Sequence, residues 1–175
     1  MNSAAVGQIY LVGFMGAGKT TVGRALGSLL AWGFADLDEM ICQRLGKSIP
    51  DIFQDHGEPL FRMEEHSLLV SLTRSPGLVV ATGGGTYVSE ENRSLIEAAG
   101  WSVWLRVSLA EALRRCGGGT GRPLLGTRAE AEALFRYRQE FYRCARTEVD
   151  TESIPPAQVA ERLLESLLAS GFEHG

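Results

Sequence analysis

Short apolar runs alternate along the chain with longer segments in which apolar residues recur at helical spacing. The short runs predict five strands, at residues 9–12, 34–38, 78–82, 101–107 and 147–150. The periodic segments predict helices at residues 19–32, 39–46, 50–56, 58–74, 90–99, 109–116 and 129–146, with a last one from 156. Strands that alternate with helices are typical of βαβ units, so the pattern predicts an α/β fold with a mainly parallel sheet covered on both faces.

Local signals mark the ends of several of these helices. Ser89 and Ser108 each precede a predicted helix and are suited to N-caps, because a serine hydroxyl accepts a hydrogen bond from the first turn. Gly100 follows the helix 90–99, at a position that favours the left-handed conformation. Pro156 fits the first turn of the last helix.

Length and composition agree with one globular domain over residues 1–175, with 45% hydrophobic and 22% charged residues. The net charge of −4 argues against a surface built to bind nucleic acid. The sequence has neither a leader-like N-terminus nor an apolar run long enough to span a membrane, and its three cysteines form no metal or disulfide pattern. We therefore expect a cytoplasmic monomer with small-molecule partners and no nucleic-acid or membrane partner.

Glycine is the residue type in clear excess, at 21 of 175 residues, against an average usage of about 7%. No Gly-X-Y period accompanies it, so the excess calls for local explanations. The first lies at Gly13–Thr20, which fits G-x-x-x-x-G-K-[ST] between a predicted strand and a predicted helix. Glycines let backbone N–H groups surround phosphate oxygens, Lys19 can reach the β- and γ-phosphates, and the Thr20 hydroxyl can bind Mg²⁺. This P-loop predicts binding of a nucleoside triphosphate.

Asp36 and Asp38 lie two residues apart in the predicted strand 34–38, so both side chains are expected on one face of the sheet, near the P-loop. Two neighbouring carboxylates repel each other unless a cation or a donor lies close. Mg²⁺ would serve one and a substrate hydroxyl the other. The alternative is a solvated turn after the strand.

Three further features suit a kinase and also have plain structural explanations. Arg62 and Glu65 are helical neighbours that could form a surface ion pair. The glycines 83–85 follow an apolar strand, where they expose backbone N–H groups at the ligand-binding edge or form a flexible loop. Arg115 and Arg122 flank the glycine-rich stretch 117–121, which suits a lid that closes over ATP or a solvated loop.

In this order the motifs resemble the shikimate kinase family of P-loop kinases. The resemblance rests on residues 13–21, 36–38, 49–65, 82–85 and 122–125, and on Arg138 four residues before Tyr142. It implies a three-layer P-loop fold with a five-stranded parallel sheet of order 2-3-1-4-5 flanked by helices, a substrate-binding region at about 36–65 and a lid at about 115–129. It also implies phosphorylation of the shikimate 3-hydroxyl by ATP with Mg²⁺, in aromatic amino acid biosynthesis.

The resemblance assigns a role to each site residue. Asp38 would bind the attacking hydroxyl and is a candidate base, with Lys19 and Arg122 as the other catalytic residues. The expected acceptor contacts are Asp38, Phe53, Phe61, Arg62, Glu65, Gly83, Gly84, Gly85 and Arg138. The expected nucleotide contacts are Gly13, Met15, Gly16, Ala17, Gly18, Lys19, Thr20, Thr21, Arg115, Arg122 and Pro155. Thr20 and Asp36 would hold Mg²⁺.

The chain departs from some relatives between its last strand and last helix, where residues 151–156 carry no basic residue to place near adenine. An apolar contact of Ile154 and Pro155 with the base is the expectation instead. Two other functions stay open at this point: a related kinase for another polyhydroxy acid such as gluconate, and a non-catalytic nucleotide-binding protein on the same fold.

Overall fold

Five parallel strands form one sheet in the order β2-β3-β1-β4-β5, in a computed structural model that describes residues 7–117 and 126–172. The strands are β1 (Gln8–Val12), β2 (Gly33–Asp36), β3 (Leu78–Ala81), β4 (Trp101–Arg106) and β5 (Thr147–Asp150). The central strand β1 has all five residues buried, because it pairs with β3 on one side and β4 on the other. The α/β class and the strand order 2-3-1-4-5 are thus confirmed.

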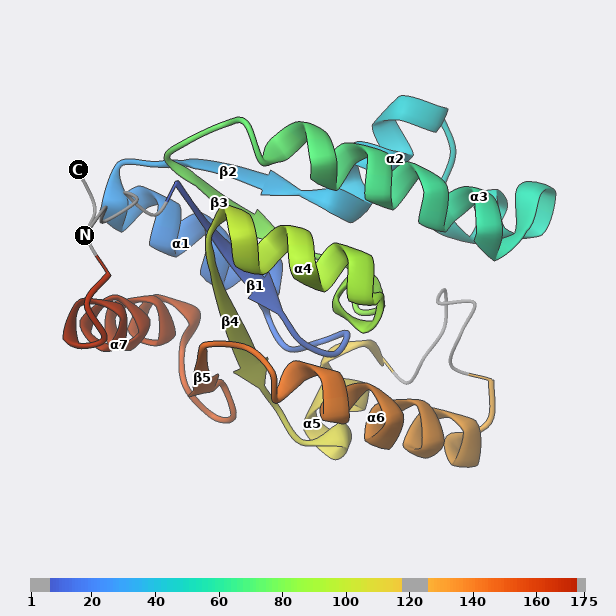
Figure 1. The fold of residues 1–175 in the computed structure, drawn as a ribbon. Helices are drawn as coiled ribbons and strands as arrows, with labels where there is room; N and C mark the ends of the chain where they lie inside the picture. The colour runs from blue at the N-terminus through green and yellow to red at the C-terminus, as the bar shows by residue number, and fades with distance from the viewer. Residues whose placement is uncertain (1–6, 118–125, 173–175) are drawn as a thin grey trace.

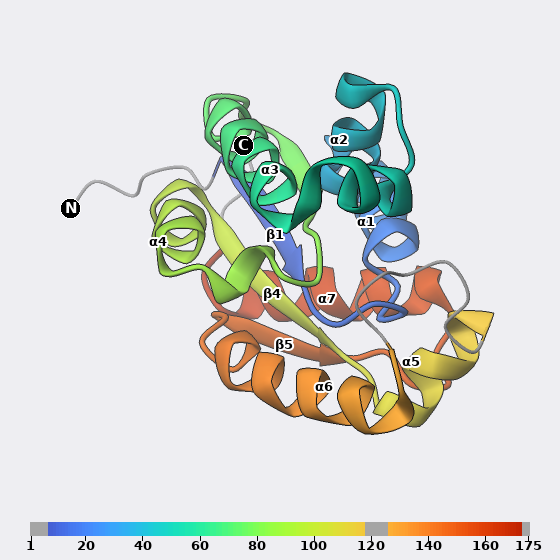
Figure 2. The same cartoon turned by 90° about the vertical axis from the view of Figure 1, so that its right-hand side faces the viewer.

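Helices cover both faces of this sheet, as Figures 1 and 2 show. They are α1 (Lys19–Leu30), α2 (Leu37–Leu45), α3 (Ile49–Leu72), α4 (Glu90–Ala99), α5 (Leu109–Arg115), α6 (Arg128–Tyr142) and α7 (Pro156–Ala169), with a 3₁₀ turn η1 (Thr86–Val88). α1 and α7 pack together on one face, while α3, α4 and α6 lie on the other. The three layers share one hydrophobic core, and no helix in the described ranges is long and apolar enough to cross a membrane.

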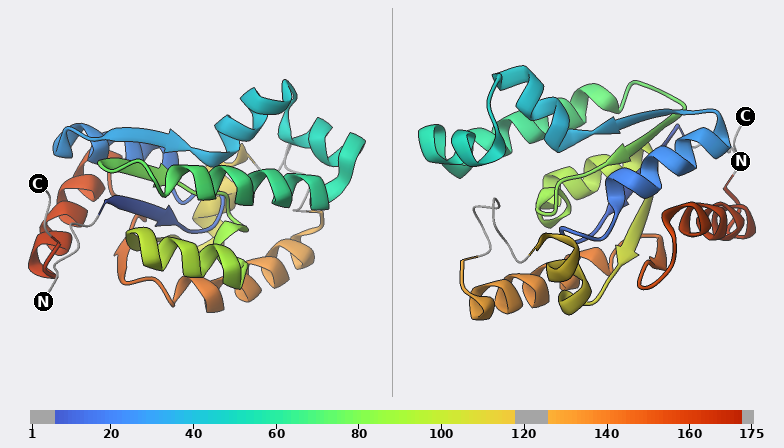
Figure 3. Two further views of the ribbon diagram at one scale, coloured as in Figure 1. Left: turned by 45° about the horizontal axis from the view of Figure 1, so that its top comes forward. Right: turned by 180° about the vertical axis from the view of Figure 1, so that it is seen from behind.

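The carboxyl ends of the strands gather the loops that carry the candidate site. The P-loop follows β1, Asp36 ends β2, and the glycines 83–85 follow β3. α2 and the first part of α3 project beyond this edge, as seen from two further sides in Figure 3. These two segments lie next to the carboxyl edge of the sheet, which is where ligands bind in parallel α/β folds.

The predicted end of the strand 34–38 is wrong. The strand 34–38 ends at Asp36, because the Asp36 carboxylate accepts hydrogen bonds from the backbone N–H groups of Asp38 and Glu39 and so begins α2. Asp38 therefore lies in the first turn of a helix rather than on the strand face shared with Asp36. The break predicted between the helices 50–56 and 58–74 is confirmed, because α3 is interrupted by non-helical backbone at Gly57 (φ 76°, ψ 174°).

Cap residues were predicted correctly except at Gly100. The hydroxyls of Ser89 and Ser108 accept hydrogen bonds from the first turns of α4 and α5, and Pro156 occupies the first turn of α7. Gly100 is extended (φ −168°) rather than left-handed. A Cβ there would lie 2.3 Å from the Gln8 carbonyl oxygen, so glycine is required by close packing against β1.

We expect the Gly100→Ala substitution to lower the free energy of unfolding by about 1–3 kcal/mol, the usual cost of overpacking, because the methyl group would collide with the β1 backbone. Gly7→Ala is the matched control, since its Cβ would meet neighbours only at 3.8 Å or beyond. Urea unfolding of both variants measures the difference. Equal midpoints for the two would contradict the packing argument.

Candidate active site at the carboxyl edge of the sheet

The P-loop has the backbone that its glycines predict. Gly13, Gly16 and Gly18 all have positive φ values, of 148°, 75° and 90°. L-residues with a side chain rarely adopt this region, so glycine keeps the loop unstrained. Gly16 is doubly constrained, because a Cβ on it would lie 2.6 Å from the Ala112 carbonyl oxygen of α5. α1 starts directly after the loop, and no side chain of the described residues caps its first turn.

Two P-loop side chains lie where their predicted roles need them. The Lys19 ammonium donates to the carbonyl oxygens of Gly13 and Phe14, at 2.8 and 2.9 Å, so it lies across the mouth of the loop. The Thr20 hydroxyl donates to Asp36 Oδ2 at 2.6 Å. A hydroxyl and a carboxylate are hard oxygen donors of the kind that Mg²⁺ prefers. These two residues therefore fit a Mg²⁺ site beside the phosphates.

A cavity opens beside the P-loop, between α2, α3 and the sheet edge. Its lining consists of Met15, Asp38, Cys42, Ser48, Ile49, Pro50, Phe53, Phe61, Arg62, Gly83, Gly84, Gly85 and Arg138. The rings of Phe53 and Phe61 lie 5.0 Å apart and form an apolar side. The two arginines and Asp38 give the same cavity polar ends. The arrangement suits a small ring that carries an acid group and hydroxyl groups.

Arg62 is held firmly by acidic neighbours on its own helix. It donates to Glu65 at 2.9 Å and to Glu58 at 3.0 and 3.1 Å. Although burial would lower its pKa, the two carboxylates raise the pKa of Arg62 above its ordinary value. Glu65 is fully buried and accepts a further hydrogen bond from the Thr86 hydroxyl at 2.5 Å. The pair is therefore no ordinary surface ion pair but part of a buried network.

Arg138 on α6 has a different environment. Only 5% of the residue is exposed, and its guanidinium lies over the Phe14 ring at 5.9 Å. Burial lowers the pKa of Arg138, and the nearby charge of Arg62 lowers it further. Within the described ranges Arg138 forms no salt bridge. A buried cation at the wall of a cavity favours an anionic ligand, because an anion would offset its desolvation.

The three glycines 83–85 leave room for charged side chains rather than for unusual backbone angles, because none of the three has a positive φ. A Cβ would meet Glu65 Oε1 at 2.7 Å and Asp38 Oδ1 at 2.9 Å from Gly83, Arg138 Nη1 at 3.0 Å from Gly84, and Arg62 Nη2 at 2.5 Å from Gly85. These contacts explain the triple glycine better than a flexible loop does. Two acidic and two basic side chains converge on one short turn.

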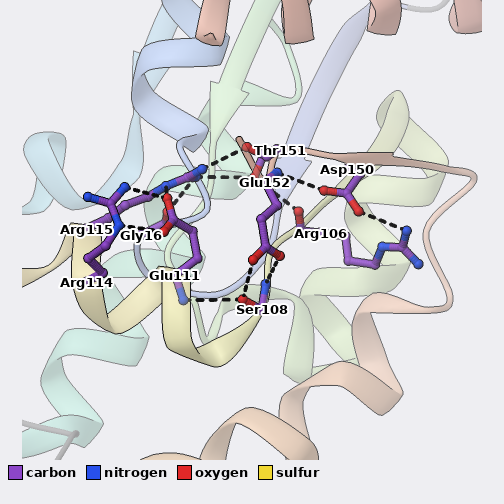
Figure 4. Close-up of polar contacts among 9 residues, drawn as sticks. All are labelled: Gly16, Arg106, Ser108, Glu111, Arg114, Arg115, Asp150, Thr151 and Glu152. Atoms are coloured by element: carbon purple, nitrogen blue, oxygen red, sulfur yellow. Dashed lines mark hydrogen bonds and ion pairs between the residues drawn. The ribbon is translucent and has the colours of Figure 1, made fainter. Parts of the chain in front are cut away.

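Arg115 joins the P-loop to the loop between β5 and α7, as the close-up in Figure 4 shows. Its guanidinium donates to the Gly16 carbonyl oxygen at 3.2 Å, to the Thr151 carbonyl oxygen at 2.8 Å and to Glu111 at 2.8 Å. Hydrogen bonds from Arg114 and Arg115 lower the pKa of Glu111 to about 2. Arg115 is thus fixed beside the P-loop.

The rest of the β5–α7 loop is held by an acidic residue. Glu152 accepts hydrogen bonds from the Ser108 hydroxyl at 2.9 Å and from its backbone N–H at 3.3 Å. Ile154 packs against the core, whereas Pro155 is exposed. Of the two residues expected to contact adenine, Pro155 is the one that is exposed and therefore accessible to a ligand.

The structure brings together most of the expected site residues, but two groups need comment. Arg122, with the lid glycines Gly118, Gly119 and Gly121, lies outside the described residues. Met15 was expected among the nucleotide contacts and is found in the lining of the cavity.

Sequence reasoning missed four lining residues: Cys42, Ser48, Ile49 and Pro50. Helical spacing could have found two of them, because Cys42 follows Asp38 by four residues and Ile49 precedes Phe53 by four. Burial and the charge of Asp38 raise the pKa of the Cys42 thiol, which keeps it protonated.

Comparisons with known proteins agree with this geometry. The family model "Shikimate kinase" matches residues 15–168. Shikimate kinases of Nitrosospira multiformis and Persephonella marina are 41% and 40% identical, over 95% and 89% of this chain and 88% and 96% of theirs. A shikimate kinase from Acinetobacter baumannii, solved in complex with shikimate, superposes with a TM-score of 0.90 at 36% identity and 96% coverage of both chains.

A likeness to a Sinorhizobium meliloti gluconokinase is weaker, at 19% identity and a TM-score of 0.56, covering 95% of this chain and 98% of that one. At that identity it shows the fold alone. On the match to the family model and the curated relatives, the chain belongs to the shikimate kinase family.

Proposed function

We propose that this chain transfers the γ-phosphoryl group of ATP to the 3-hydroxyl of shikimate, giving shikimate 3-phosphate and ADP in aromatic amino acid biosynthesis. The observation that carries the proposal is a buried, unneutralised Arg138 in the same cavity as Arg62 and Asp38, directly beside a P-loop. Such a cavity places an acid group and a hydroxyl at opposite ends of one small acceptor.

The acid end of the acceptor would bind to Arg62 and Arg138. Planar guanidinium groups can each give two parallel hydrogen bonds to a carboxylate, which a lysine cannot do. Glu65 orients Arg62 and is itself fixed by the Thr86 hydroxyl. The acceptor ring would lie between the aromatic side formed by Phe53 and Phe61 and the glycine turn 83–85.

The reacting hydroxyl would lie at Asp38, in the first turn of α2. Asp38 can accept the hydroxyl hydrogen bond and so direct the oxygen at the γ-phosphorus. The proton leaves that oxygen as the P–O bond forms and the bond to the ADP oxygen breaks, with Asp38 as its acceptor. Most of the rate is expected from such positioning, because phosphoryl transfer needs little covalent chemistry from the protein.

The nucleotide would be held by the P-loop residues Gly13–Thr21, with Lys19 on the β- and γ-phosphates. Thr20 and Asp36 would hold Mg²⁺, the second directly or through water. When bound, Mg²⁺ neutralises charge on the phosphate oxygens. Arg122, in the proposed lid at about 115–129, would add a positive charge at the transferred group.

At the base, Arg115 and Pro155 are the proposed contacts of adenine. Arg115 is already fixed in place by Glu111 and Thr151, so little ordering would be needed on binding. The proposed acceptor region, about 36–65, contains α2 and the first half of α3. We also propose that the chain acts as a monomer in the cytoplasm.

An assay that couples ADP release to a second enzyme tests the proposal, combined with direct detection of the phosphorylated acid. Shikimate with Mg-ATP should give stoichiometric ADP and a shikimate phosphate ester, and gluconate under the same conditions should give neither. Turnover of gluconate alone, or binding of ATP and shikimate with no ADP formed, would overturn it.

We expect Asp38→Asn to lower kcat by about 100-fold or more, the range for loss of a general base, while the KM for ATP changes by less than about twofold. The reason is that Asp38 faces the acceptor cavity rather than the phosphates. Asp55→Asn is the matched control, since Asp55 forms an exposed ion pair with Lys47. Steady-state kinetics with both substrates varied gives the answer, and near-normal turnover would rule out Asp38 as the base.

We expect Arg138→Lys to raise the KM for shikimate by about tenfold, which corresponds to about 1.4 kcal/mol of binding free energy, with the KM for ATP nearly unchanged. Lysine keeps the charge but loses the planar pair of donors. Arg146→Lys is the control, because Arg146 pairs with Glu97 away from the cavity. Equal losses of affinity for both substrates would contradict the role of Arg138.

A further inference from the structure

Tyr142 is a buried residue that the proposed mechanism does not use. It is the last residue of α6, one helical turn after Arg138, and only 1% of it is exposed. Its hydroxyl donates a hydrogen bond to the Gly84 carbonyl oxygen. The bond joins the end of a helix to the middle of the glycine turn, two segments 58 residues apart in sequence.

The ring and the hydroxyl of Tyr142 are both constrained. Its ring packs against Trp104 of β4, with centroids 6.3 Å apart. Burial raises the pKa of Tyr142 strongly, although a hydrogen bond and the positive charge of Arg138 oppose the shift. Tyr142 therefore stays a neutral phenol at physiological pH, and its hydroxyl remains available as a donor.

The hydrogen bond from Tyr142 fixes the orientation of the whole peptide group between Gly84 and Gly85, and not only that of the Gly84 carbonyl. A trans peptide is planar, so the Gly84 carbonyl and the Gly85 N–H point in opposite directions. Holding the carbonyl toward α6 therefore sets the direction of the Gly85 N–H, at a residue that lines the acceptor cavity. Gly84 also forms the surface against which Arg138 Nη1 packs, since a Cβ there would lie 3.0 Å from that atom.

Arg138 lies close to Phe14, Gly84 and Tyr142. Its guanidinium lies over Phe14 and against Gly84, and its positive charge opposes the rise in the pKa of the Tyr142 hydroxyl. The Tyr142 hydroxyl donates to the glycine turn and lies within reach of the arginine's charge. It thus joins the glycine turn to the helix that carries Arg138.

From this geometry we infer that Tyr142 is a positioning residue for acceptor binding: its hydroxyl sets the glycine turn 83–85 and the Arg138 guanidinium at a fixed separation. The inference rests on the proposed function, since it deepens the role of the same acceptor cavity. Loss of the hydroxyl would leave the half-buried Gly84 carbonyl without this donor. The turn and the arginine would then be free to move apart, and the acceptor would lose affinity while the nucleotide would not.

The experiment compares Tyr142→Phe with Tyr10→Phe. Both variants remove one buried phenolic hydroxyl and keep the ring. The Tyr10 hydroxyl donates to Gln8 at 3.2 Å. Gln8 is the first residue of β1, at the amino end of the strand, whereas the cavity lies at the carboxyl edge of the sheet. The readouts are thermal unfolding midpoints, steady-state constants for each substrate, and the dissociation constants of shikimate and of ADP by calorimetry.

Tyr142→Phe should raise the KM and the dissociation constant for shikimate about tenfold, with the KM for ATP and the dissociation constant of ADP within about twofold of wild type. Tyr10→Phe should leave all four constants unchanged, whatever its effect on the unfolding midpoint. Unchanged shikimate constants in Tyr142→Phe, or equal weakening of shikimate and ADP, would overturn the inference. Failure of the wild-type chain to phosphorylate shikimate would instead reject the proposed function.

Discussion

The packing of acidic and basic side chains directly on the glycine turn 83–85 is the contact on which the proposed acceptor end of the site depends. Glu65, Asp38, Arg138 and Arg62 approach the turn so closely that a single added methyl group would displace one of them. Their charges are partly balanced by one another, through the pair of Arg62 with the buried Glu65. Arg138 forms no salt bridge among the described residues, and this imbalance is the reason to expect an anionic group of the acceptor in the cavity.

The same edge of the sheet links the acceptor to the nucleotide. Asp36 accepts from Thr20 of the P-loop with one oxygen and caps α2 with the other. The cap places Asp38 in the first turn of α2, and α2 packs on α3, which carries Arg62. The Asp36 carboxylate thus holds the Thr20 hydroxyl and the first turn of α2 in fixed positions relative to each other. On the nucleotide side, Arg115 ties the P-loop to the β5–α7 loop in a comparable way.

Sequence reasoning succeeded where the signal is local. The P-loop, most helix caps and the strand order expected from the family resemblance all agree with the structure. It failed at Asp36 and Gly100 for physical reasons. A strand that ends in an aspartate looks the same in sequence whether the carboxylate lies on the sheet or caps the next helix. An extended glycine required by a neighbouring strand looks like one that ends a helix.

Other features of the site were beyond the reach of sequence patterns. The crowding that demands glycine at 83–85 involves side chains from α2, α3 and α6. Cys42 and Ile49 lie at helical spacing from predicted site residues, yet only the fold shows that this face lines the cavity. In the sequence, Tyr142 was notable only for lying four residues after Arg138. Its hydrogen bond to Gly84 depends on how α6 packs against the sheet, which the sequence pattern does not show.

A crystal structure of the chain with ADP, Mg²⁺ and shikimate tests the central claim most directly. The account predicts the shikimate carboxylate between Arg62 and Arg138, its ring beside Phe53 and Phe61, and its 3-hydroxyl within hydrogen-bonding distance of Asp38. The Tyr142 hydroxyl should still donate to Gly84. A carboxylate bound away from both arginines, or a 3-hydroxyl far from Asp38, would contradict the account.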